Sequence, residues 1–114
     1  AYSWLERNYK IELSMEMLKE AYDLRENDPY ITDSLGWGYY LINDFENAEK
    51  YLKKAVELMP YDPIVNDHYG DILWMLNRKI QARYFWNNVL NLDETDDEMK
   101  IDVKKKIIYG IEKT

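Results

Sequence analysis

The 114-residue chain contains no cysteine, which excludes a disulfide framework, a thiolate metal site and a thiol nucleophile. Proline occurs only three times and glycine four times, and no segment is of low complexity, so we expect order along almost the whole chain. No apolar run approaches the roughly 20 residues of a membrane-spanning helix, and the first residues do not resemble a cleavable signal. The length predicts a single domain, whereas the compartment stays open between cytoplasm and export.

The charge of the chain is mainly negative, with 22 Asp and Glu against 15 Lys and Arg and a formal net charge of -7. This balance repels nucleic-acid phosphates and anionic membrane surfaces, so we expect neither as a partner. Aromatic residues are abundant instead, with 11 Tyr and 4 Trp. Together these features favour a protein or peptide partner with basic and apolar residues, and they indicate no cofactor.

An internal repeat organises the chain. Sliding the sequence against itself until Asp28 falls on Asp62 superposes further identical residues, and the same register extends upstream. The array therefore starts in mid-repeat, and we expect further repeats or a targeting segment before Ala1. The aligned pairs are Asp28-Pro29 with Asp62-Pro63, Asp33 with Asp67, Gly36 with Gly70, Asn43 with Asn77, Ala48 with Ala82 and Leu58 with Leu92.

This repeat resembles the tetratricopeptide repeat (TPR) family, whose units have the same length. The unit 63–96 matches less well than the unit 29–62, because Tyr69, Leu73 and Glu94 stand in place of the family's Leu, Tyr and Pro. A narrower resemblance is to the C-terminal end of alphaproteobacterial TPR proteins, through DSLGWGYYL, NDHYGDILW and ARYFWNNVLNL. Unit 29–62 has Leu35-Gly36, Tyr39, Ala48, Ala55, Leu58 and Pro60 at the family spacing, with Thr32 and Leu52 replacing two aromatic residues.

The resemblance implies an all-α fold, in which tandem antiparallel helix pairs form a short right-handed TPR solenoid closed by a C-terminal capping helix. Within one domain, 1–114, we expect a truncated repeat at 1–28, repeats at 29–62 and 63–95, and the capping helix at 96–114. The apolar spacing and the resemblance predict seven helices, at about 1–8, 11–26, 29–42, 45–59, 63–76, 79–92 and 96–112.

Capping residues mark the expected helix ends. Aspartate accepts hydrogen bonds from the first backbone N–H groups of a helix, and asparagine tolerates a left-handed conformation at its end. The expected N-caps are Asp28 and Asp62, the expected left-handed ends are Asn43 and Asn77, and Thr95 with Glu98 forms the expected capping box of the last helix.

Two of the glycines have counterparts one repeat apart. Glycine costs about 1 kcal/mol against alanine inside a helix, so Gly36 and Gly70 need a structural reason. The resemblance implies that each allows the two helices of its repeat to approach closely. Gly38 has no counterpart, since Ile72 occupies the equivalent position, and the only role that we assign to it is room for a neighbouring aromatic such as Trp4 or Tyr39.

In the TPR family the first helix of each pair lines a concave groove, and the ligand-facing positions recur in every repeat. The groove of this chain is therefore expected to be aromatic and acidic, which suits Lys and Arg side chains and disfavours the acidic C-termini bound by part of the family. The positions implied are Tyr30, Asp33, Ser34, Trp37, Tyr40, Leu41, Ile64, Asp67, His68, Asp71, Trp74 and Met75. Our candidate partner-binding residues are Asp33, Trp37, Tyr40, Asp67, His68, Asp71 and Trp74.

Other interpretations of these residues stay open. The tryptophans and Tyr40 are alternatively core residues that neighbouring repeats cover. Asp33 and Asp67 are alternatively local caps or partners of Arg83 or Lys79. Helical spacing places His68 on one face with its acidic neighbours, but no metal signature fits them and we expect no metal site. A nucleophile formed by Ser34 and His68 lacks an oxyanion site. The run Lys104–Lys106 is expected to be the solvated face of the capping helix.

Two functions follow. We favour a non-enzymatic adaptor that binds a segment of another protein in its groove. The alternative is a structural end-piece of a longer solenoid, which stacks on preceding repeats or on another copy of itself through an aromatic N-terminal edge. That edge comprises Tyr2, Trp4, Tyr9, Trp37 and Tyr40. No catalytic residues are assigned.

Overall fold

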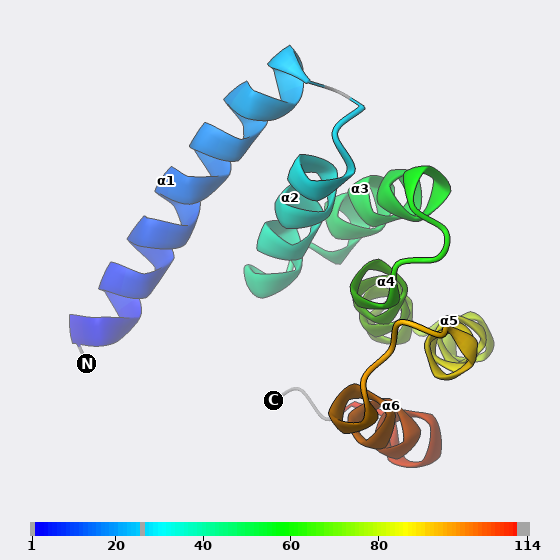
Figure 1. Cartoon of the computed structure of the whole chain (residues 1–114). Coiled ribbons are helices and arrows are strands. Elements are labelled where there is room, and N and C mark those ends of the chain that lie inside the picture. Colours follow the sequence, from blue (N-terminus) through cyan, green and yellow to red (C-terminus); the bar gives the residue numbers. More distant parts are fainter. Residues whose placement is uncertain (1, 26, 112–114) are drawn as a thin grey trace.

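The computed structural model describes the backbone of residues 2–25 and 27–111 and the side chains of residues 13–25 and 27–111. The expected all-α fold is confirmed, because this described part contains helices and no strand. The helices follow one another along a curved stack (Figure 1). They are α1 (Tyr2–Leu24), α2 (Pro29–Leu41), α3 (Phe45–Leu58), α4 (Pro63–Met75), α5 (Lys79–Asn91) and α6 (Asp97–Tyr109).

The first helix differs from the prediction. We expected two helices, at 1–8 and 11–26, but α1 runs without a break from Tyr2 to Leu24. The inter-helix turns of the later units contain Asn43 and Asn77, which adopt φ values of 66° and 63°. Tyr9 stands at the equivalent place one repeat before Asn43, and a bulky aromatic residue disfavours that left-handed conformation. The equivalent place thus lacks the asparagine of the later turns, and the helix continues.

The expected caps of α2 and α4 are confirmed. The carboxylate of Asp28 accepts hydrogen bonds from the backbone N–H groups of Tyr30 and Ile31, at 3.0 and 3.3 Å. Asp62 accepts the equivalent pair from Ile64 and Val65, at 2.9 and 3.1 Å. A proline follows each aspartate at the first helical position, where no N–H group is needed.

The cap of α6 lies one residue later than expected. Asp96 is the N-cap, and its carboxylate accepts a hydrogen bond from the backbone N–H of Met99 at 2.7 Å. The hydroxyl of Thr95 instead donates to the carbonyl oxygen of Val89 at 2.6 Å, and Thr95 is buried. Thr95 thus ties the loop to α5, because its side chain points to the preceding helix.

The two aligned glycines lie where helices approach closely, as expected. A Cβ atom at Gly36 would meet the side chain of Leu52 on α3, and one at Gly70 would meet the indole of Trp86 on α5. The described neighbour of Gly38 is a methionine, whereas the side chain of the expected Trp4 lies outside the described residues. A Cβ atom there would meet the sulfur of Met15 on α1, so the missing side chain makes room for a methionine.

The core is continuous from α1 to α6, since each helix packs on its successor and α2 also touches α4. Its fully buried residues include Leu35, Leu52, Trp86 and Val103. No helix in the described residues is both long and apolar enough to cross a bilayer.

Candidate functional site

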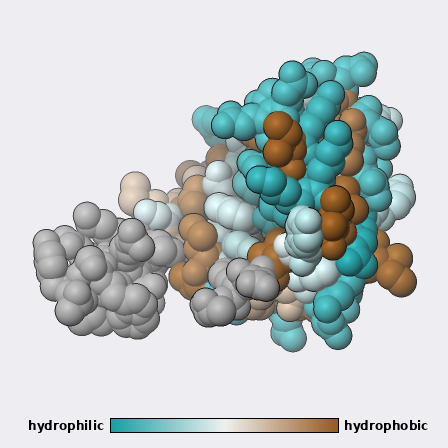
Figure 2. All heavy atoms as spheres, turned by 90° about the horizontal axis from the view of Figure 1, so that it is seen from below, coloured by the Kyte–Doolittle hydropathy of each residue, from teal (hydrophilic) through white to brown (hydrophobic). Residues whose placement is uncertain are grey.

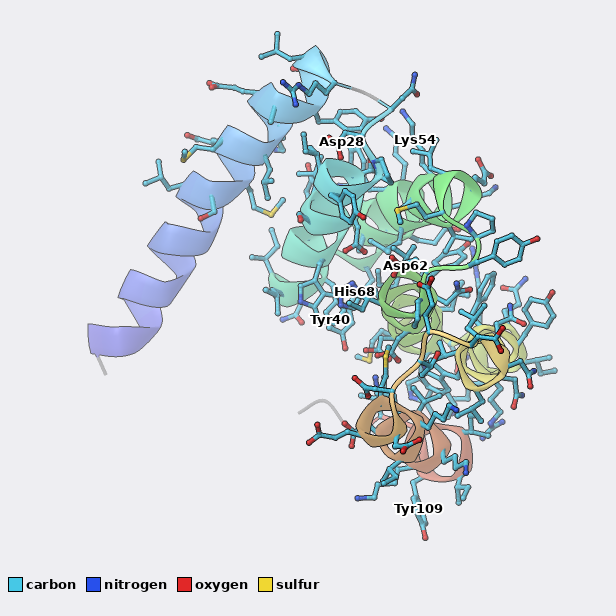
Figure 3. The ribbon with its side chains drawn as sticks, in the orientation of Figure 1. Asp28, Tyr40, Lys54, Asp62, His68 and Tyr109 are labelled. Atoms are coloured by element: carbon cyan, nitrogen blue, oxygen red, sulfur yellow. The ribbon has the colours of Figure 1, made fainter. Side chains whose placement is uncertain are left out.

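The centre of the candidate site is an aromatic stack that joins α2 to α4. The indole of Trp37 stacks on the imidazole of His68, with 4.0 Å between ring centroids, and on the ring of Tyr40, at 4.4 Å. Figure 3 labels the two stacking partners, Tyr40 on α2 and His68 on α4. Trp37 is half-buried, so one part of its ring faces the neighbouring repeat and another part faces solvent. Trp37 therefore joins two other predicted site residues, Tyr40 and His68, in one stack.

Asp33 holds the imidazole of His68 in this stack. The Nδ1 atom of His68 lies 3.0 Å from Oδ1 of Asp33, and both side chains keep about a fifth of their surface exposed or less. His68 pairs with Asp33 through Nδ1, and no hydrogen bond between His68 and Ser34 is recorded among the described side chains. The predicted partners of Asp33 on α5, Lys79 and Arg83, were wrong.

An apolar hollow of about 340 Å³ opens beside Trp37, between α1 and α2. One wall is formed by Met15 and Leu18 of α1, and Gly38 keeps the opposite wall low because it has no side chain. The size suits one or two apolar side chains of a ligand. The remaining lining residues are Ser14, Ser34, Trp37 and Leu41.

Asp67 and Asp71 belong to a second, charged part of the site. The Nζ atom of Lys106 on α6 donates to Oδ1 of Asp67 at 2.9 Å and to the two carboxylate oxygens of Asp71 at 3.0 and 3.2 Å. The indole N–H of Trp86 donates to Asp71 at 3.1 Å. Lys106 thus departs from the expected solvated face, whereas Lys104 and Lys105 are exposed as predicted.

Burial shapes the protonation of this charged cluster. It raises the pKa of Asp71 to about 6, with the charge of Asp67 adding to the effect and Lys106 and Trp86 opposing it. Burial alone would lower the pKa of Lys106, but the charges of Asp71 and Asp67 raise it overall. Burial likewise raises the pKa of Tyr40 to about 12, so its phenol stays neutral at pH 7. The cluster therefore links α4 to α6 through charges shielded from water.

The geometry separates the three groups that the sequence placed on one helical face. His68 turns toward Asp33 on α2, whereas Asp67 and Asp71 turn toward Lys106 on α6. No group of three His, Asp or Glu side chains in the described residues is arranged to hold a metal ion.

Trp74 lies at the α4–α6 end of the site and is half-buried there. Its indole N–H donates to the carbonyl oxygen of Ile111 at 3.2 Å, and a Cβ atom at Gly110 would collide with its ring. The cations of Lys79 and Arg83 lie 4.9 and 5.3 Å from the ring centroid. The C-terminal segment and α5 therefore engage Trp74, whereas Trp37 borders an open hollow.

Sequence reasoning missed Lys106 and the α1 wall of the hollow. The sequence did contain a signal for the burial of Lys106. Lys106 stands at the same repeat position as Gly38 and Ile72, and both of these residues face inward. A lysine at an inward position requires a buried anion, and Asp71 supplies it. Met15 gave no such signal, since its role depends on how α1 packs on α2.

We compared the chain with known proteins by sequence and by fold. No family model and no curated protein matches the sequence. Among solved structures, the first TPR domain of Spaghetti (RPAP3), bound to the HSP90 peptide SRMEEVD, is similar with a TM-score of 0.75. The likeness covers 90% of this chain and 82% of that one, at 17% sequence identity. The chain has a TPR fold. The narrower alphaproteobacterial resemblance finds no support in these comparisons and stays a prediction.

Proposed function

We propose that this TPR domain is a protein-interaction module that binds a peptide segment of a partner on its inner surface. The observation that carries the proposal is the half-exposed Trp37 beside the apolar hollow between α1 and α2. A rigid aromatic ring next to a preformed hollow provides contact area at a low cost in conformational entropy. In this proposal the repeats at 29–62 and 63–95 supply the surface, between the truncated repeat at 1–28 and the capping helix at 96–114.

The charges of the inner surface favour a basic and apolar segment. Asp33 borders the aromatic stack, and a second hollow of about 430 Å³ is lined by Asp67, Asp96, Glu98 and Asp102 together with Met99 and Lys106. A basic residue of the ligand gains attraction there, and an apolar residue fills the hollow beside Trp37. The peptide SRMEEVD, which the similar RPAP3 domain binds, carries three acidic side chains and is expected to be repelled.

A catalytic role is not part of the proposal. The TPR fold is typically an interaction scaffold, and no hydrogen bond joins the single histidine to a serine among the described side chains. The proposed activity is therefore binding alone, with specificity set by the aromatic stack and the carboxylates.

A peptide array tests the proposal. The array holds short peptides with basic and apolar residues in varied order, with SRMEEVD as the acidic comparison. Trp37→Ala is expected to weaken the best peptides at least tenfold, a loss of about 1.4 kcal/mol. Tyr84→Ala on α5 is the matched control, because its ring is 62% exposed and lies outside both hollows, and it should leave affinity within about twofold.

Two outcomes contradict the proposal. One is the absence of any peptide that the wild type binds and Trp37→Ala does not. The other is equal loss with Trp37→Ala and Tyr84→Ala, which places the binding site elsewhere.

A second candidate is the structural end-piece that stacks on other repeats. It is favoured by the outer face of α1, where Met17 is 65% and Leu24 is 85% exposed. The side chains of Tyr2, Trp4 and Tyr9, which the sequence placed at this edge, lie outside the described residues. Trp37 and Tyr40 stack on each other and on His68 within the chain. Any stacking contact at this end therefore involves the outer face of α1.

A further inference from the structure

The outer face of α1 carries an apolar stripe with one charge in it. Leu13, Met17 and Leu24 are 47%, 65% and 85% exposed, and the exposed Glu20 lies between the last two. Their helical spacing places them on one side of the helix. The opposite side, with Met15, packs against α2. The described contacts of α1 therefore leave this stripe open to solvent.

The outer face of α6, at the other end of the stack, carries the complementary pattern. Ile101 and Ile108 are 55% and 67% exposed, and the exposed Lys105 lies between them. The opposite side, with the buried Val103, packs on the core. Figure 2 views this end from below and shows hydrophobic patches separated by hydrophilic atoms. The described residues record no hydrogen bond or ion pair for either Lys105 or Glu20.

We propose that these two faces bind each other in different copies of the chain, so that α6 of one copy packs antiparallel on α1 of the next. In that orientation the spacing of Met17, Glu20 and Leu24 along α1 equals the spacing of Ile108, Lys105 and Ile101 read backwards along α6. Met17 meets Ile108, Glu20 meets Lys105 and Leu24 meets Ile101. The two stripes then cover each other, and each central charge gains an opposite partner. This inference is independent of peptide binding on the inner surface, and it assigns the two surfaces that a self-stacking end-piece would use.

The repeat register gives the order of the two helices in this pairing but not the faces, because Ile101, Lys105 and Ile108 stand where Asp67, Asp71 and Trp74 line the inner surface. α6 lies one repeat after α4, in the place of a first helix, whereas residues 11–24 lie one repeat before α3, in the place of a second helix. α6 followed by α1 of the next copy thus continues the order of first and second helices. The close packing within a repeat uses Gly36 and Gly70, and α6 has Lys104 at that position, so the proposed contact uses a different face. We therefore expect weak, reversible association.

The two faces are different, so the contact is head to tail. Such contacts extend into chains of copies unless the rotation closes a ring. Sedimentation velocity of the wild type from about 10 µM to about 1 mM should show a mass average that rises with concentration, as expected for a dissociation constant of about 0.1 mM. Association should weaken at high salt, because Glu20 and Lys105 are exposed.

Charge reversal tests the pairing. Glu20→Lys and Lys105→Glu should each reduce the apparent association constant about tenfold or more, because like charges then face each other. A mixture of the two variants should regain association and form chains in which the variants alternate, since each face of one variant then meets the opposite charge on the other. The chain that carries both changes should regain wild-type association. The controls are Glu57→Lys and Lys53→Glu, which make the same charge changes at exposed positions of α3 and should not alter association.

Circular dichroism of every variant confirms that it is folded. The proposal is overturned by a wild type that stays monomeric at about 1 mM. It is also overturned by single variants that associate as the wild type does, or by a mixture that associates no better than either variant alone. None of these outcomes depends on whether Trp37 binds a peptide.

Discussion

The two halves of the inner surface occupy the same repeat positions but differ in chemistry. Asp33 and Asp67 are equivalent residues of successive repeats, yet Asp33 pairs with a histidine at the edge of an aromatic stack and Asp67 pairs with a lysine beside a buried aspartate. Trp37 and Asp71 also share a position, and one is half-exposed while the other is buried. The repeat thus determines where a side chain lies, and the adjacent helix determines whether it remains accessible.

The glycines show the same contrast inside the repeats. Gly36 faces the end of the side chain of Leu52 and Gly70 faces the rigid indole of Trp86, and both of these partners are fully buried. The first contact can adjust by a rotamer change. The second cannot, because the indole N–H is also bonded to Asp71.

The largest expected effect on stability comes from removing the charge of Lys106, which pairs with Asp67 and Asp71 in the more buried half of the inner surface. Lys106→Met leaves Asp67 and Asp71 without their counter-ion, and we expect the free energy of unfolding to fall by about 3 kcal/mol. Asp33→Asn breaks the more exposed pair and should cost about 1 kcal/mol or less. Urea unfolding of both variants measures the difference, with Lys105→Met as the control for a neighbouring exposed lysine. Equal losses in Lys106→Met and Asp33→Asn would show that the two pairs do not differ.

The pH dependence of stability is the next largest effect. Asp71 has a pKa of about 6 in the folded chain against an ordinary value of 3.8, so the folded state binds more protons between these pH values. The free energy of unfolding contributed by this group therefore falls as the pH rises from about 4 to about 6, by about 2 kcal/mol. Asp71→Asn should remove this slope while Asp33→Asn keeps it, as measured by urea titrations at several pH values. A wild-type slope that persists in Asp71→Asn would assign the effect to another group.

The smallest effect separates the two repeats by their glycines. Gly70→Ala should lower stability by about 1.5 kcal/mol, because the indole of Trp86 cannot yield to the added methyl group. Gly36→Ala should cost less than about 1 kcal/mol, since Leu52 can rotate and alanine favours the helix. Thermal and urea unfolding of the two variants provide the measurement. The reverse order would contradict the assigned difference in rigidity.

Much of the fold was predictable because its signals are local. The caps at Asp28 and Asp62, the left-handed Asn43 and Asn77, and the two packing glycines recur at a fixed spacing. The site was less predictable, because its contacts join residues that are far apart in the chain. The stack of Trp37 on His68 and the bond from Lys106 to Asp71 each connect two different units of the array, and no local pattern specifies them.

The sequence alone determined the paired-helix architecture, since periodic apolar residues, capping aspartates and glycines act over a few residues through backbone hydrogen bonds and close packing. Only the tertiary structure decided that α1 is one helix, that Met15 fills the space above Gly38 and that Lys106 is buried. These outcomes depend on which side chains meet across helices. Accessibility of the predicted binding residues followed from the same contacts, because α6 and the C-terminal segment engage Asp71 and Trp74 while the hollow beside Trp37 stays open.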